Sequence, residues 1–423
     1  MLIELSITNY RSIREKVTLS MIADKYDSKS NNVFDYKLPN KKGLRLLNTV
    51  LIFGSNGSGK SNIIRAVFDL LYLLKNPTHA GTGIANYNPF KFNSETLNLP
   101  SEFQIRFLDK NFIPYLYTVS FNKEQIVSEE LLYWPNGRET LAFQRSTNVK
   151  EKGIHILNIG KSAQEGREFE KIYSNNFGLS HFSSLTPNKV ILNAFNAIQE
   201  IFVVNTLNST HRYGKRNIPE LIATSDKFRK KINALIRFAD LNIYEIKAEK
   251  DLSFQNEVDS ESNNGKKKYI LLANHEFYNG NKRTKILKSH LFSEESEGSK
   301  SVLGLGSEII LALEEGGVLF VDEFETSLHP LLSKALIRIF QNEKLNTKKA
   351  QLIFTTHDTN LMDQTIFRRD QIWFSTKNTR GESSLYSMVD FAELREGHAF
   401  EKWYLSGKFG ALPNLDDIEK AFG

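Results

Sequence analysis

The sequence lacks several features that would place it in a familiar class. It has no cysteine, which excludes disulfide bonds, thiolate metal sites and a Cys-x-x-Cys zinc hook. It has no run of about 18 apolar residues, and it begins with the strand-like segment 2–7 rather than a basic and apolar leader. We therefore expect no membrane span, no signal peptide and a cytoplasmic location.

Internal repeats and a sustained heptad array are also absent. Without heptads, the middle of the chain is expected to be a compact domain rather than a long coiled coil. The 40% hydrophobic fraction supports folded domains, and 423 residues suggest two or three compact units. A net charge of +6 permits contact with an anionic polymer but is modest for this size, so nucleic-acid binding stays open.

A glycine-rich loop lies between an expected strand at 46–53 and an expected helix at 62–74. The loop residues are Gly54, Ser55, Asn56, Gly57, Ser58, Gly59, Lys60, Ser61 and Asn62. Such a turn presents backbone N–H groups and a helix N-terminus to phosphate oxygens. Lys60 would reach the β- and γ-phosphates, and the Ser61 hydroxyl would ligate Mg²⁺. The loop therefore predicts a site for ATP and Mg²⁺.

Two carboxylates follow a second buried strand near the other end of the chain. Residues 318–321 are apolar and run into Asp322 and Glu323 at the strand's carboxyl edge, where α/β sheets bind ligands. Asp322 would hold Mg²⁺ through water, and Glu323 would polarise the attacking water. These residues predict that one ATP site is assembled from both ends of the chain.

Two further motifs flank this acidic strand. The strand at 351–356 ends in His357, which can hydrogen-bond the γ-phosphate or the attacking water. The segment 295–300 directly precedes an expected helix. Within it, Ser296 and Gly298 form a turn that offers hydroxyls and a helix N-terminus to a phosphate.

The distribution of patterns predicts three parts. Residues 1–150 form a strand-rich lobe around the glycine-rich loop, and residues 291–423 return to strand–helix alternation. Between them, residues 151–290 form a mainly helical insertion, with helical patterns at 188–207 and 226–241 and a strand at 269–278. The fold class predicted is α/β.

The order of the motifs resembles the ABC-type ATPases of the SMC/RecF/OLD group, most closely the stand-alone OLD-like ATPases of anti-phage defence. Stretches 368–374 and 404–410 strengthen the resemblance to this subgroup, and the insertion lies largely outside it. The segments that carry the group resemblance are Asn9 to Ser12, Gly54 to Asn62, Ser296 to Lys300, Asp322 to Glu323, Ser327 to Pro330 and Thr356 to Asp358.

The resemblance implies a fold and a set of roles. The fold is an ABC-type P-loop ATPase head, in which a mixed sheet and an antiparallel strand-rich lobe are interrupted by the insertion. Glu323 is the catalytic base and His357 the switch histidine, while Arg11 lies near the nucleotide. Ser296 and Gly298 form the signature motif, which reaches the γ-phosphate held by a second protomer, with residues 327–330 as the D-loop. Hydrolysis should then need a homodimer or a higher homo-oligomer.

Two departures limit the resemblance. The metal-sensing glutamine of the family has no clear match, with Gln104 and Gln144 as the candidates. Only 66 residues follow His357, too few for the Toprim nuclease module of OLD nucleases. The leading hypothesis is therefore an AAA family ATPase that acts as sensor or scaffold with a separate effector, a nuclease or toxin, in phage defence.

Two other functions compete with this hypothesis. A RecF-like ATPase of DNA repair or recombination would bind DNA through basic clusters at 229–231, 266–268 and 282–285. A GTPase is disfavoured because Asn122-Lys123-Glu124-Gln125 lacks the aspartate of the Asn-Lys-x-Asp box that recognises guanine. The effector, the activating trigger and the role of the insertion are not specified by the sequence.

Overall fold

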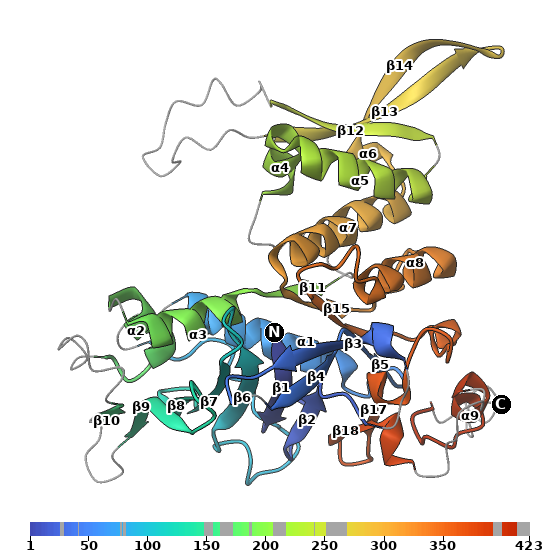
Figure 1. Ribbon diagram of the computed structural model, residues 1–423. Coiled ribbons are helices and arrows are strands. Elements are labelled where there is room, and N and C mark those ends of the chain that lie inside the picture. Colours follow the sequence, from blue (N-terminus) through green and yellow to red (C-terminus); the bar gives the residue numbers. More distant parts are fainter. Residues whose placement is uncertain are drawn as a thin grey trace.

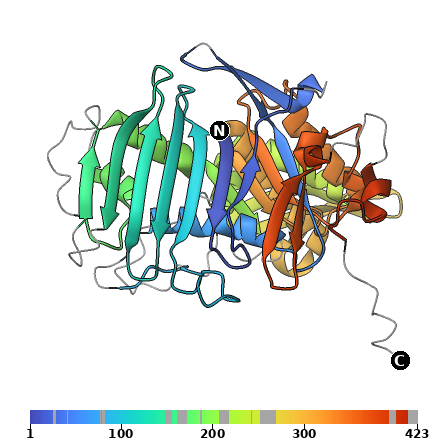
Figure 2. The same ribbon diagram turned by 90° about the horizontal axis from the view of Figure 1, so that it is seen from below.

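Two large sheets lie side by side, and a smaller unit of helices and strands projects from them (Figure 1, Figure 2). In the computed structural model, the described residues are 1–25, 29–40, 42–76, 78, 82–147, 155–160, 172–185, 188–205, 217–240, 242–250, 269–391 and 400–412.

The first sheet is the six-stranded mixed sheet that contains the P-loop strand. Five strands are parallel and the last, β18, is antiparallel to its neighbour. All five residues of each of β5, β15 and β16 are buried, as expected for parallel strands covered on both faces. In spatial order the strands are β11 (Ile201–Asn205), β15 (Val318–Asp322), β16 (Gln351–Thr355), β5 (Thr49–Phe53), β17 (Ile372–Lys377) and β18 (Ser383–Ser387).

The second sheet has seven antiparallel strands, and α1, α2 and α3 contribute to the same apolar core as its inner face. Alternate residues are buried along strands such as β6, which leaves the other face to solvent. In spatial order the strands are β10 (His155–Ile159), β9 (Thr140–Thr147), β8 (Ile126–Tyr133), β7 (Pro114–Phe121), β6 (Ser101–Leu108), β1 (Leu2–Thr8) and β2 (Val17–Ser20).

The projecting unit packs α4 and α5 against a three-stranded sheet, and its strands β13 and β14 extend outward as a hairpin (Figure 1). The three strands are β12 (Ile243–Lys250), β13 (Tyr269–Asn279) and β14 (Lys282–His290). A separate two-stranded sheet pairs β3 (Val33–Lys37) with β4 (Gly43–Leu47). The helices are α1 (Lys60–Lys75), α2 (Gly178–Leu185), α3 (Lys189–Gln199), α4 (Ile218–Thr224), α5 (Asp226–Ala239), α6 (Leu291–Glu294), α7 (Glu297–Glu315), α8 (Pro330–Gln341) and α9 (Phe400–Leu405).

The α/β fold class is confirmed, but the description of the insertion as mainly helical is wrong. Four helices and five strands occupy its described residues. The helix expected at 188–207 ends at Gln199, and β11 follows, parallel to β15. Ile201, Phe202, Val203 and Val204 are β-branched or aromatic, which suits a strand buried in a parallel sheet. The apolar residues after the helix therefore belong to a separate strand and not to the end of the helix.

A second correction concerns the P-loop strand. The expected strand at 46–53 is two strands, because β4 ends at Leu47 and β5 begins at Thr49. Asn48 separates them, and its side-chain amide donates to the Asn31 carbonyl at 2.7 Å. The turn allows β4 to pair with β3 while β5 enters the central sheet.

The boundaries at 150 and 290 stay predictions. Elements from the insertion contact both lobes, because β10 pairs with β9 and β11 pairs with β15. The Glu129 carboxylate of β8 also accepts from the Gly178 and Leu179 N–H groups at the start of α2, at 2.7 and 2.9 Å. No helix in the described part of the chain combines the length and apolarity needed to span a bilayer.

Candidate functional site

The P-loop leads from β5 to the first residue of α1, as predicted. Gly59 is the N-cap of α1 and carries no side chain that could bond the helix. Its φ is +108°, and a Cβ at this position would lie 2.2 Å from Ser383 Oγ, so only glycine fits. The N–H groups of the first turn therefore have no side-chain cap and are available to an anion such as phosphate.

Lys60 is almost fully buried beneath the loop. Its Nζ donates to the Gly54 and Ser55 carbonyls at 2.7 and 3.1 Å. Burial lowers the pKa of Lys60 to about 8, against the opposing effect of nearby carboxylates, of which Asp322 is the strongest. A desolvated ammonium held by two carbonyls is prepared to interact with phosphate oxygens, because those would replace neutral acceptors with charged ones.

The two ends of the chain meet at Asp322. Its Oδ1 accepts hydrogen bonds from Ser61 Oγ at 3.1 Å and from Thr355 Oγ1 at 2.6 Å. The same Thr355 hydroxyl accepts from the Glu323 N–H at 2.8 Å, so one side chain fixes both acidic residues. The sequence analysis did not identify Thr355, although its place at the carboxyl end of the neighbouring strand was a signal that could have found it.

Glu323 has a backbone conformation that is rare for a residue with a side chain. Its φ is +52°, in the left-handed region, immediately after the last residue of β15. Thr326 Oγ1 donates to Glu323 Oε2 at 3.4 Å. A strained residue at the edge of a ligand site is typical of a functional position, because surrounding contacts must maintain it.

His357 lies beside Lys60, and the two nitrogens Nδ1 and Nζ are 3.5 Å apart. Its backbone N–H donates to Glu325 Oε1 at 2.6 Å. Burial, followed by the charge of Lys60, lowers the pKa of His357. A neutral imidazole at this position can donate or accept one hydrogen bond on each nitrogen, as a contact to phosphate or water requires.

Several small polar side chains brace the loop from the N-terminal lobe and from β18. Asn62 Nδ2 donates to Ser12 Oγ at 2.6 Å, and Ser383 Oγ donates to the Ser58 carbonyl at 2.7 Å. Ser383 and Ser12 also share a hydrogen bond of 2.8 Å. These bonds connect the P-loop with both ends of the chain, and no sequence pattern links Ser12 with Ser383.

Arg11 is exposed, and its contacts lead toward the middle of α1. Its Nε donates to Tyr10 Oη at 3.0 Å, and Tyr10 Oη donates to Asp69 Oδ2 at 2.6 Å. Its φ of +51° belongs to a turn in which its N–H donates to the Asn88 carbonyl. A role for Arg11 at the nucleotide stays a prediction.

The signature-like turn has the geometry of a helix start. Ser296 is the N-cap of α7 and accepts from the Ser299 N–H at 3.2 Å. A Cβ on Gly298 would lie 3.3 Å from the Ser327 carbonyl, so the turn contacts the expected D-loop of its own chain. Among the described residues, no hydrogen bond joins Ser296 to the P-loop. Its role toward a second protomer stays a prediction.

The two glutamine candidates lie on the antiparallel sheet. Gln104 Nε2 donates to Thr118 Oγ1 at 3.2 Å, and Gln104 Oε1 accepts from Lys16 Nζ. Gln144 is exposed on β9. No contact recorded for the described residues connects either side chain with Ser61 or Asp322, so neither is supported as a metal-sensing residue.

The residues present fit a magnesium ion held together with a nucleotide. The described residues contain no cluster of three or more His, Asp or Glu side chains that could bind a metal by themselves. Ser61 and Asp322 offer a hydroxyl and a carboxylate to one point, and Mg²⁺ usually takes its other ligands from phosphates and water. Ser58 Oγ is buried in the loop and has no hydrogen-bond partner within the described part of the chain, which also suits a site that receives a ligand.

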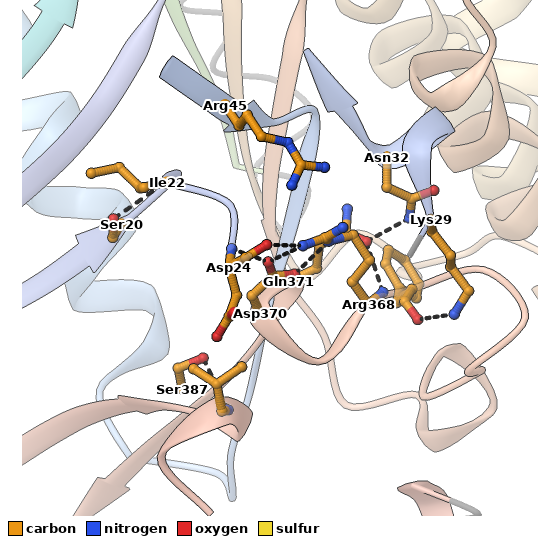
Figure 3. Close-up of polar contacts among 12 residues, drawn as sticks. Ser20, Ile22, Asp24, Lys29, Asn32, Arg45, Arg368, Asp370, Gln371 and Ser387 are labelled. Atoms are coloured by element: carbon orange, nitrogen blue, oxygen red, sulfur yellow. Dashed lines mark hydrogen bonds and ion pairs between the residues drawn. The ribbon is translucent and has the colours of Figure 1, made fainter. Parts of the chain in front are cut away.

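A buried polar network positions β17 next to the P-loop strand (Figure 3). Arg368 and Asp370 form a buried ion pair, with Nε to Oδ1 at 2.8 Å, and Asp370 also accepts from the Asp24 N–H. Gln371 donates to the Thr49 carbonyl at 2.8 Å and accepts from Asn32 at 2.5 Å. The stretch that marked the subgroup resemblance therefore has a structural role, because it joins β17, β5 and the segment before β3.

A cavity of about 1130 Å³ lies elsewhere, between α3, α5, α7 and α8. Its lining includes the apolar side chains of Leu235, Ile309 and Leu313 and the charged side chains of Lys231 and Glu314. No P-loop residue, Asp322, Glu323 or His357 lines it. The site is therefore identified by its chemistry rather than by cavity size.

Two solved structures show a low similarity to the chain. Among solved structures, the chain is similar to the SMC head domain from Thermotoga maritima at 13% identity, covering 91% of this chain and 98% of that one, with a TM-score of 0.39. It is also similar to the recombination mediator protein RecF in an ATP structure, at 13% identity, 91% and 97% coverage and a TM-score of 0.38. These identities and TM-scores are too low to support the assignment of the site. A search of curated proteins found no match.

A family model matches residues 50–363, a range that includes both the P-loop and His357. Because this match covers most of the chain and both halves of the site, the protein belongs to the family described as "AAA domain, putative AbiEii toxin, Type IV TA system".

Proposed function

We propose that the chain is an ABC-type ATPase that hydrolyses ATP with Mg²⁺ and acts as a dimer. The observation that carries the proposal is the convergence of Lys60, Ser61, Asp322 and His357 through direct contacts, although the chain separates them by up to 297 residues. Phosphoryl transfer depends on positioning and charge stabilisation, which this arrangement supplies.

Each side chain has a role in this reaction. Lys60 neutralises phosphate charge, and Ser61 with Asp322 holds the metal ion. Glu323 orients and polarises the attacking water, and the neutral His357 contacts the γ-phosphate. Bound Mg²⁺ supplies the charge that stabilises the phosphate oxygens. The strained φ of Glu323 supports its role as base.

Two chains are proposed to complete each other's sites. Ser296 lies at the N-terminus of α7 and has no hydrogen bond to the P-loop of its own chain among the described residues. In the proposed dimer, Ser296 and Gly298 approach the phosphates held by the partner, with the neighbouring D-loop at the seam. The helix N-terminus adds a favourable dipole for phosphate.

Mixing two inactive variants tests this arrangement. Lys60→Ala removes the phosphate lysine, and Ser296→Arg blocks the turn, so each homodimer should be inactive. A mixed dimer keeps one intact site, formed by Ser296 of the first variant and Lys60 of the second. An equal mixture should recover up to about a quarter of wild-type ATPase activity, because half of the dimers are mixed. No recovery in a mixture that forms dimers would overturn the shared site.

The proposed biological role is that of a sensor or scaffold subunit with a separate nuclease or toxin in anti-phage defence. It is supported by the subgroup resemblance of residues 368–374 and 404–410. Plaque counts should fall in cells that express this chain with the protein encoded beside it, and Lys60→Ala should abolish the protection. Protection by the neighbouring protein alone would contradict the role.

A RecF-like DNA-binding ATPase is the second candidate, favoured by the basic hairpin β13–β14. Lys282, Arg283 and Lys285 are exposed on β14, which projects from the molecule (Figure 1). If the hairpin binds duplex DNA, affinity should fall steeply with salt, and Lys282→Glu with Lys285→Glu should weaken it. The matched control reverses two exposed lysines elsewhere, Lys344→Glu and Lys402→Glu. Equal losses in both double variants would count against a specific DNA surface.

A further inference from the structure

A third acid lies at the site, and no motif assigned it a role. Glu325 follows Glu323 by two residues, and its Oε1 accepts from the His357 N–H at 2.6 Å. Its other oxygen, Oε2, is buried and has no hydrogen-bond partner among the described residues. Burying a carboxylate oxygen without a partner is costly, so such a group is more typical of a functional position than of packing.

Glu325 completes a series of bonds between the ends of two neighbouring strands. The Glu323 N–H donates to Thr355 Oγ1 at 2.8 Å, and the Phe324 N–H donates to the Thr355 carbonyl at 3.0 Å. Glu325 then accepts from His357, two residues beyond Thr355. The three residues after β15 are thus each bonded to a residue at the end of β16 or just beyond it. These bonds fix the main chain that carries His357.

The same carboxylate influences the His357 imidazole. Burial and Lys60 lower the pKa of His357, and among the groups that oppose them Glu325 is the strongest, ahead of Glu323 and Asp322. The imidazole Nδ1 lies 3.5 Å from the Lys60 ammonium, and the Glu325 carboxylate is bonded to the backbone N–H of the same histidine. The exposed His357 is thus held at its side chain by the contact with Lys60 and at its main chain by the bond to Glu325.

We propose that Glu325 is a positioning residue for ATP hydrolysis, because its hydrogen bond to the His357 main chain holds the imidazole beside Lys60. The inference rests on the proposed function and adds a residue to it. The side chain acts through its reach and its acceptor oxygen. A neutral group of the same length should therefore replace it, whereas a shorter acid should not.

Three substitutions separate reach from charge. Glu325→Gln keeps the length and an acceptor oxygen, Glu325→Asp keeps the charge but is one methylene shorter, and Glu325→Ala removes both. We expect kcat within about threefold of wild type for Gln and a fall of about 100-fold for Asp and Ala, since a small misplacement of a reacting group has this effect. The Kd for ATP should change less than about threefold in all three, because Lys60 keeps its contacts.

Hydrogen exchange at the His357 amide gives a readout that does not depend on activity. The amide should be protected in wild type and in Glu325→Gln, and it should exchange at least tenfold faster in the Asp and Ala variants. Glu343→Gln is the control, because Glu343 is exposed, and this variant should match wild type in every measurement. If Glu325→Ala does not fold, the Gln and Asp variants still give the comparison.

The outcomes separate this inference from the proposed function. If Gln lowers kcat as much as Asp and Ala do, the charge acts directly and the positioning role is overturned. Wild-type kcat or wild-type amide protection in the Asp variant would also overturn it. If the wild-type chain hydrolyses no ATP while the exchange pattern holds, the proposed function fails but the anchoring of His357 by Glu325 stands.

Discussion

The P-loop pocket and the turn that begins α7 are both proposed to bind phosphate, but they are anchored to different parts of the molecule. In the pocket, Lys60, Asp322 and His357 are connected within the two ATPase lobes. The turn is connected to the insertion instead, because Ser299 Oγ donates to Asp240 Oδ2 at 3.2 Å and His275 Nε2 lies 2.8 Å from Glu295 Oε1.

The P-loop pocket is therefore positioned by the two lobes, whereas the turn that begins α7 is positioned by the insertion. The central strands are buried along their whole length, so the pocket is rigid before a ligand arrives. By contrast, β14 is exposed at almost every residue, and it supports the turn through Ser289, which bonds Glu295. Substitutions in the two regions should therefore affect binding and turnover differently.

The largest effect is expected at Lys60. Lys60→Ala removes the buried ammonium, so nucleotide binding should be abolished in a filter or fluorescence assay. Lys75→Ala is the matched control, because Lys75 is an exposed lysine at the far end of the same helix. Undiminished ATP binding by Lys60→Ala would remove the P-loop from the site.

The next effect separates binding from turnover. Glu323→Gln keeps the side-chain shape but removes the base, so kcat should fall by about 10²–10⁴-fold while ATP still binds. The variant should accumulate a closed dimer with ATP, which light scattering would detect. Turnover at the wild-type rate would exclude Glu323 as the base.

A smaller effect is expected from pH. Phosphate binds the charged form of Lys60, whose pKa is about 8 in the ligand-free protein, so ATP affinity should fall up to about tenfold per pH unit above 8. The free energy of unfolding of the ligand-free protein should change in the opposite direction and rise with pH. Between pH 8 and 10.5 the unfolded chain binds more protons at this lysine, so the ligand-free protein should gain stability as pH rises. Titration and scanning calorimetry at several pH values would measure the ATP affinity and the stability. An ATP affinity that does not change from pH 7 to 10 would contradict the predicted role of Lys60.

The smallest effect is expected where the insertion holds the turn. His275→Ala removes the contact with Glu295, so kcat should fall by roughly threefold to tenfold while the Kd for ATP stays unchanged. His290→Ala on the exposed end of β14 is the control. A change in ATP affinity equal to the change in kcat would show that the two regions are not separate.

The sequence predicted the pocket far better than the insertion. Strand β15 ends at Asp322 as predicted, and β16 begins at the predicted Gln351 and ends one residue before the predicted end, because continuous apolar runs between polar residues indicate buried parallel strands. Strand β14 could not be predicted, since an exposed strand rich in lysine shows no apolar alternation. The roles of Thr355 and Glu325 depend on contacts between neighbouring strand ends, which the order of residues along the chain does not contain.

The pairing of β11 with β15 has a mechanical consequence. Asn205, the last residue of β11, is in register with Asp322, so the two strands end together at the edge of the sheet that holds the proposed metal site. A displacement of β11 would be passed by its backbone hydrogen bonds with β15 to the strand that ends in Asp322. The energy needed to shift the carboxylate would include its hydrogen bonds to Ser61 and Thr355 as well as the packing of the buried strand.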